Sequence, residues 1–126
     1  MSYGKIRANF IEHGSAGTAT TEGIVKGTKS WVQFNGNSTI TVNGSLNVAS
    51  LTDHTTGDYS VNFTTNMDDT NYCVNTDSVS ESNETDPRDT SVNLTRTFST
   101  STYGIICKYN AGSANDRSKM FGEVNR

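Results

Sequence analysis

The sequence contains little of what usually carries chemistry in a protein: one proline, two cysteines, two histidines and a single tryptophan among 126 residues. Its net charge is −3 and Lys and Arg are nowhere clustered, which argues against a nucleic-acid partner. No segment approaches the roughly 20 apolar residues that cross a bilayer, and we expect no membrane insertion. The opening residues, MSYGKIRANFIEHG, have no apolar stretch behind their basic residues, and we therefore expect synthesis in the cytoplasm without a signal peptide.

The residues that could support catalysis are few and scattered. His13 and His54 lie in turn-like sequences, and the sequence places no nucleophile or carboxylate beside either of them. Ser15 lies in GSAG, which lacks the spacing of a nucleophile elbow. We therefore expect neither an enzyme nor a protein that holds a cofactor or a metal ion.

The two cysteines lie in separate strand-like runs with apolar neighbours. Cys73 occurs in NYCVN and Cys107 in YGIICKYN, and no histidine lies within a few residues of either. Two cysteines alone supply too few ligands for a structural zinc site. Cytoplasmic synthesis favours two buried free thiols, and a disulfide that joins two sheets is the alternative.

What the chain does contain is Thr, Ser, Asn and Gly in place of apolar and charged residues. Hydrophobic residues make up 32% of the chain, against roughly 45–50% in a typical domain, and charged residues make up 18%. Disordered chains pair low hydrophobicity with high net charge and few aromatic residues. Here one Trp, five Tyr and five Phe accompany a net charge of only −3, and we therefore expect a folded protein.

Apolar and polar residues alternate in short runs that are separated by turn sequences, which is the pattern of half-buried strands. The dipeptide Asn43-Gly44 suggests a tight hairpin turn, because both central positions of a type I′ turn need positive φ. No helical periodicity is present. The expected strands are 3–11, 21–27, 29–36, 38–44, 45–52, 58–65, 71–79, 90–98, 102–110 and 119–124.

Strands of this length and spacing predict an all-β protein, an antiparallel β-sandwich. We expect the sandwich to occupy residues 28–126, after an N-terminal segment, residues 1–27, that docks on a neighbour or joins subunits. A chain with so little apolar material has a marginal core on its own, which favours a homo-oligomer, with a trimer as the expected state. The expected core consists of Trp31, Phe34, Tyr59, Val61 and Phe63.

Two sets of residues are candidates for recognition. The most polar stretch of the chain runs from Asp77 to Asp89, and its carboxylates lack the spacing of a calcium-binding loop. Exposed loops on a rigid β scaffold often carry recognition, and we expect this loop to do so through Glu81, Asn83, Glu84, Asp86 and Arg88. A sugar platform of exposed aromatic rings would use Tyr103 and Tyr109.

Part of the chain resembles a recurrent module of tailed-bacteriophage virion proteins, related to tail fibres and tail collars. That module reads KAWVxFNG, then a Thr/Val strand, then SxNVSSITD, then GDYxVNF and an Asn-Tyr strand. The matching segments here are KSWVQFNG (29–36), SLNVASLTD (45–53), GDYSVNF (57–63) and Asn71-Tyr72. The sequence departs from the module at Ser30 and His54, neither of which threatens a fold.

The resemblance implies a structural protein of a phage particle, trimeric, with no enzymatic residues. Its location would be the virion and its partners other virion proteins. The leading hypothesis is a tail-fibre-type protein that contributes to host attachment. One alternative is a capsid decoration or head-fibre protein that stabilises the shell, and another is a carbohydrate-binding module whose partner is a host surface glycan.

Overall fold

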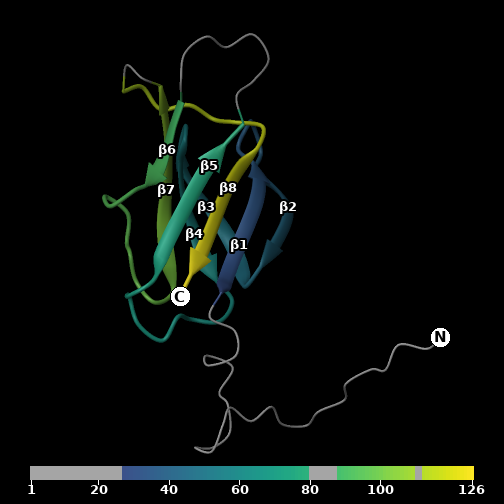
Figure 1. Cartoon of the computed structure of the whole chain (residues 1–126). Coiled ribbons are helices and arrows are strands. Elements are labelled where there is room, and N and C mark those ends of the chain that lie inside the picture. The colour runs from purple at the N-terminus through teal and green to yellow at the C-terminus, as the bar shows by residue number, and fades with distance from the viewer. Residues whose placement is uncertain (1–26, 80–87, 110–111) are drawn as a thin grey trace, which may run out of the picture.

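A computed structural model describes residues 27–79, 88–109 and 112–126, and in these residues the protein is all-β, without a helix (Figure 1). Eight strands form two four-stranded antiparallel sheets that face each other in a sandwich-like arrangement. No helix in the described ranges is long and apolar enough to cross a membrane. The expected all-β class with antiparallel sheets is confirmed.

The first sheet, named here the β1 sheet, has the strand order β2-β1-β8-β5. The second, named the β4 sheet, has the order β3-β4-β7-β6. The strands of the β1 sheet are β2 (Thr41–Leu46), β1 (Thr28–Asn35), β8 (Met120–Asn125) and β5 (Cys73–Ser78). Those of the β4 sheet are β3 (Val48–Thr55), β4 (Asp58–Phe63), β7 (Thr102–Tyr109) and β6 (Arg88–Val92).

The core lies between the two sheets and is built from alternate residues of the central strands. The β1 sheet contributes Val32, Phe34, Met120 and Val124. The β4 sheet contributes Tyr59, Val61, Phe63, Tyr103, Ile105 and Cys107. Aromatic rings meet across the gap, with 5.1 Å between the ring centroids of Phe34 and Tyr59. Phe34, Tyr59, Val61 and Phe63, four of the five expected core residues, are therefore buried.

Trp31 is the fifth expected core residue, and its assignment to the core is wrong, because 40% of its surface is exposed. Side chains along a strand point alternately to opposite faces. Ser30, Val32 and Phe34 point into the sandwich and are buried, which places Trp31 on the outer face of β1. Trp31 and Phe34 are three positions apart on one strand, so regular alternation puts them on opposite faces. The register shift between Gln33 and Phe34 in the pairing with β2 has its extra residue, Asn43, on β2 and leaves the alternation of β1 intact.

The turn expected at Asn43-Gly44 is also wrong, because both residues lie within β2. The chain instead turns at Asn47, whose φ is 54°, where it passes from β2 in the β1 sheet to β3 in the β4 sheet. The Asn47 side chain holds this turn: Nδ2 donates to the carbonyl oxygens of Lys29 and Thr65 at 3.2 and 3.0 Å. Its Oδ1 accepts from the backbone N–H of Thr65 at 2.7 Å. An asparagine that tolerates positive φ and makes three hydrogen bonds therefore sets the turn.

In the C-terminal third, the strand expected over 90–98 ends early, at Val92. Asn93 is buried and begins a turn, since its Oδ1 accepts from the backbone N–H and the hydroxyl of Thr95 at 3.0 and 2.6 Å. The expected boundary at residue 28 coincides with the first residue of β1, Thr28. The proposed docking segment, residues 1–27, lies almost wholly outside the described residues.

The two cysteines are both free, which contradicts the alternative of a disulfide. Cys107 is buried in the core, as expected. Cys73 is exposed, and the expectation that both thiols are buried is wrong. The inward residues of β5 are Val74, Thr76 and Ser78, so alternation turns Cys73 outward.

Candidate functional site

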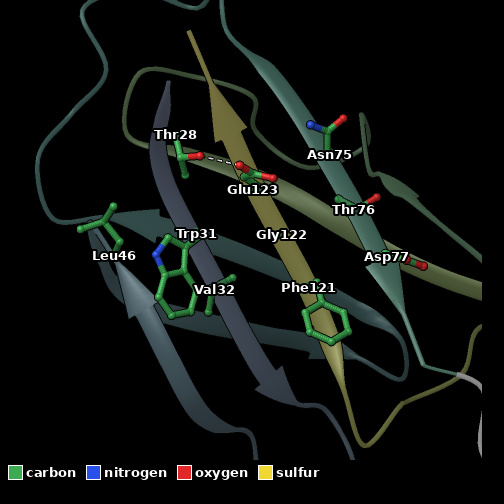
Figure 2. Close-up of a pocket in the computed structure, with 10 residues that line it drawn as sticks. All are labelled: Thr28, Trp31, Val32, Leu46, Asn75, Thr76, Asp77, Phe121, Gly122 and Glu123. Atoms are coloured by element: carbon green, nitrogen blue, oxygen red, sulfur yellow. Dashed lines mark hydrogen bonds between the residues drawn. The ribbon is translucent and has the colours of Figure 1, made fainter. Parts of the chain in front are cut away.

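The outer face of the β1 sheet carries a groove of about 650 Å³ (Figure 2). All four strands of the sheet contribute to its lining. The side chains that give it its chemistry are Trp31, Leu46, Asn75, Asp77, Phe121 and Glu123. The groove therefore combines two aromatic rings and one aliphatic side chain with an amide and two carboxylates.

Strand register places these residues in two rows across the sheet. In the first row, Trp31 pairs with Leu46 of β2 and with Glu123 of β8, and Glu123 in turn pairs with Asn75 of β5. In the second row, Phe121 lies between Gln33 of β1 and Asp77 of β5. Cross-strand neighbours on one face have Cβ atoms about 4.5–5.5 Å apart. Each ring consequently has a polar side chain beside it.

Trp31 is the largest exposed aromatic side chain of the groove, and a glycine gives it room. A Cβ atom on Gly44 would lie 3.0 Å from Cη2 and 3.2 Å from Cζ3 of the indole. The absent side chain at Gly44 thus lets the indole lie close to β2. Figure 2 shows the ring between β1 and β2, next to Leu46.

Glu123 is held in a fixed position at the upper end of the groove. The hydroxyl of Thr28 donates a hydrogen bond to Glu123 Oε1 at 2.5 Å, drawn as a dashed line in Figure 2. Within the described part of the chain, Oε2 of the same carboxylate has no hydrogen-bond partner. One oxygen is therefore available to a ligand while the other positions the group.

The remaining polar side chains lie on β5. Oδ1 of Asp77 accepts a hydrogen bond from the backbone N–H of Ser78 at 2.7 Å. Asn75 is exposed, and its amide makes no hydrogen bond within the residues that the structure describes. Neither Lys, Arg nor His lines the groove. The electrostatic character of the site is therefore negative.

The expected sugar platform of Tyr103 and Tyr109 does not exist. Tyr103 is fully buried between the sheets, where a ligand cannot reach it. Its hydroxyl lies against the inner side of Gly122, where a Cβ atom would collide with it. Tyr109 is partly buried at the end of the same strand. The expectation failed because alternation along β7 directs Tyr103, Ile105 and Cys107 into the core.

Most of the expected recognition loop lies outside the described residues. Glu81, Asn83, Glu84 and Asp86 lie outside the described residues. Arg88 is the first residue of β6, where its backbone pairs with that of Tyr109. The role of this loop in recognition stays a prediction.

The groove itself was missed by sequence reasoning, although part of its signal was present. The alternation of Met120, Gly122 and Val124 as inward residues puts Phe121 and Glu123 on the outer face.

His54, one of the residues considered for catalysis, lies outside the groove and makes a contact of 2.8 Å between its Nε2 and the hydroxyl of Ser60 on the β4 sheet. In the described residues, no three His, Cys, Asp or Glu side chains gather as they would around a metal ion.

No family model matches this chain, and neither a curated protein nor a solved structure proves similar to it. The resemblance to the phage module stays a prediction from the sequence. The chemistry of the groove follows from its own residues: the exposed indole of Trp31, the partly exposed ring of Phe121, and the two carboxylates of Asp77 and Glu123.

Proposed function

We propose that this protein is a trimeric, tail-fibre-type component of a tailed-phage virion, and that the groove on its β1 sheet binds a saccharide of the host surface. The observation that carries the proposal is the exposed indole of Trp31, with Phe121 on the same face and polar side chains beside both rings. The phage resemblance of residues 29–72 supports the location in the virion.

Saccharides are recognised by a combination of ring faces and hydrogen-bonding groups, and the groove offers both. The C–H groups on one face of a pyranose are apolar and stack on an aromatic ring, while its hydroxyls need donors and acceptors. Trp31 supplies the ring, and Glu123 and Asn75 lie in the same row to meet the hydroxyls. Asp77 is a further hydrogen-bond acceptor in the lining of the groove.

The sheet makes this site rigid before any ligand arrives. Trp31 and Glu123 lie opposite each other on two hydrogen-bonded central strands, β1 and β8. Sites on strands hold their side chains more precisely than sites on loops do. Little conformational entropy is then lost on binding, which favours useful affinity even from a small contact area.

Binding of the purified full chain to an array of bacterial surface saccharides tests the groove. We expect Trp31→Ala to weaken binding by about tenfold or more, because the stacking surface is removed. The matched control is Leu94→Ala, which truncates a side chain that is 80% exposed and lies outside the groove. Binding that is unchanged by Trp31→Ala would contradict the site.

Gold labelling of intact particles with an antibody against the protein tests its location. Gold at the tail supports a tail-fibre-type protein. Gold over the head instead favours a capsid decoration protein, and particles without gold would contradict a place in the virion altogether. If no particle is labelled, the remaining interpretation is a saccharide-binding protein that acts outside the particle.

Capsid decoration is a second candidate, and one observation favours it. Trp31 and Leu46 face each other on neighbouring strands and are 40% and 48% exposed. Adjacent exposed apolar side chains are typical of protein contacts as well as of ligand sites. If this pair packs on a capsid protein, Leu46→Asp should release the protein from particles, because a charged side chain would then lie in the apolar contact.

A further inference from the structure

The charges in the groove define the class of saccharide further, an inference that rests on the proposed saccharide-binding function. We propose that the groove selects an amino sugar, a saccharide unit that carries a protonated, non-acetylated amino group. The ammonium group would lie at Glu123, with the sugar ring on Trp31. Neutral and acidic sugars would bind more weakly.

The lining of the groove is acidic without compensation. Glu123 and Asp77 both reach it, and no basic side chain is among the residues that line it. Lys119 lies one residue before β8 and is exposed, but it is not part of the lining. A ligand in the groove therefore meets two carboxylates and no cation. A uronate or phosphate group would be repelled, and such repulsion is one way in which binding sites exclude wrong ligands.

The position of Glu123 allows a specific contact with the ligand, in addition to the general negative potential of the groove. Thr28 binds Oε1, while Oε2 has no partner within the described part of the chain. An ammonium group donates charge-assisted hydrogen bonds, which are about twice as strong as neutral ones. A hydroxyl or an acetamide N–H at the same place can also donate to this carboxylate, but it carries no positive charge and lacks the Coulomb attraction between two ions.

Trp31 adds a second preference for a positively charged ligand. Glu123 and Trp31 are cross-strand neighbours on one face, so a sugar whose amino group contacts Glu123 brings that cation close to the indole. Indole is the strongest cation–π partner among the aromatic side chains. Acetylation removes the positive charge and with it both interactions. The acetylated and non-acetylated forms of one sugar thus provide a matched pair of ligands.

The experiment is calorimetric titration of the full chain at about pH 6, where the amino groups are protonated. The ligands are oligosaccharides of equal length made of glucosamine, N-acetylglucosamine or galacturonic acid. We expect glucosamine to bind about tenfold more tightly than N-acetylglucosamine, the effect of one charge-assisted contact, and galacturonate to bind most weakly. Added salt should reduce the preference.

Two variants with equal change of net charge separate the specific contact from general attraction. Glu123→Gln should abolish the preference for glucosamine, while its amide oxygen can still accept the bond from Thr28. Asp89→Asn, an exposed residue of β6 in the β4 sheet, should leave the preference intact. Equal loss in both variants would mean attraction of a cationic sugar to an acidic protein, and would overturn the assignment to Glu123.

The outcomes also separate this inference from the proposed function. Equal or tighter binding of N-acetylglucosamine, still lost in Trp31→Ala, would overturn the amino-sugar inference and leave saccharide binding in the groove standing. Absence of binding to these ligands and to every saccharide on the array would overturn both.

Discussion

The guanidinium of Arg96 lies against the carboxylate of Asp58, with Nε 3.1 and 3.0 Å from the two carboxylate oxygens and Nη2 2.5 Å from Oδ2. Asn93 donates a further bond to Oδ1 at 2.8 Å. These contacts join the first residue of β4 to the turn that follows β6. The hydrogen bonds from Arg96, against an opposing effect of burial, hold the pKa of Asp58 below its ordinary value of 3.8.

This ion pair predicts a specific loss of stability in acid. Because the pKa of Asp58 is lower in the folded state than in the unfolded state, the contact stabilises the fold above pH 3.8 and is lost as the pH falls through the folded-state value. Asp58→Asn should therefore lower the melting temperature at neutral pH. The difference from the native protein should shrink as the pH falls well below 3.8.

Thermal unfolding followed by circular dichroism across this pH range measures the effect. Asp89→Asn is the control, because it removes an exposed carboxylate from β6. A difference between Asp58→Asn and the native protein that is the same at every pH would show that the charge of Asp58 does not contribute.

The core makes a second prediction, at Phe63. This ring is 6% exposed and packs against Tyr72 and Tyr103, with centroids 5.9 and 5.6 Å away. Phe63→Ala should reduce the free energy of unfolding by about 3–5 kcal/mol, as large-to-small changes in a core do. Urea titration measures this, with the exposed Leu94→Ala as a near-neutral control. An unchanged midpoint would contradict the core.

The buried face of a strand could be predicted from the sequence where local alternation of apolar and polar residues is enough to determine it. Phe34, Tyr59, Val61 and Phe63 fall on the buried side of β1 and β4. Trp31 was wrongly assigned to the core, although it lies one residue from the inward Val32 and alternation therefore places it on the outer face. Hydrophobicity alone does not decide which face of a strand is buried.

The groove could not be predicted because it depends on contacts between residues far apart in the sequence. Glu123 meets Trp31 only because β8 inserts between β1 and β5, a topology that no local pattern reveals. The turn at Asn47 was missed for a similar reason, since its side chain bonds to Lys29 and Thr65. Both features rest on register between strands, which the fold as a whole determines.

The two thiols should differ in reactivity, which gives a third prediction. Cys73 is exposed at the start of β5, whereas Cys107 is fully buried, with its sulfur 3.9 Å from the hydroxyl of Ser78. A thiol-specific reagent should modify one cysteine in the native protein and both in denaturant. Cys73→Ser should leave no rapidly reacting thiol. Two rapid reactions in the native chain would contradict the burial of Cys107.

The hydroxyl groups of two buried tyrosines provide a fourth prediction: the same substitution, Tyr to Phe, should have opposite effects on the stability of the fold at the two positions. Within the described residues, Tyr103 Oη is buried and has no hydrogen-bond partner, whereas Tyr72 Oη donates to the carbonyl of Ser99 at 2.7 Å. Tyr103→Phe removes an unsatisfied polar group and should stabilise the fold by about 1 kcal/mol. Tyr72→Phe removes a satisfied one and should destabilise it by about 1 kcal/mol.

Urea titration of the two variants measures both effects, and their comparison is more informative than either alone. Both rings pack against Phe63, so the loss of an oxygen atom changes the packing in similar surroundings. The sign of the change then depends on hydrogen bonding. If Tyr103→Phe destabilises the fold as much as Tyr72→Phe does, the hydroxyl of Tyr103 has a hydrogen-bond partner. The first candidate for that partner is a buried water molecule near Gly122.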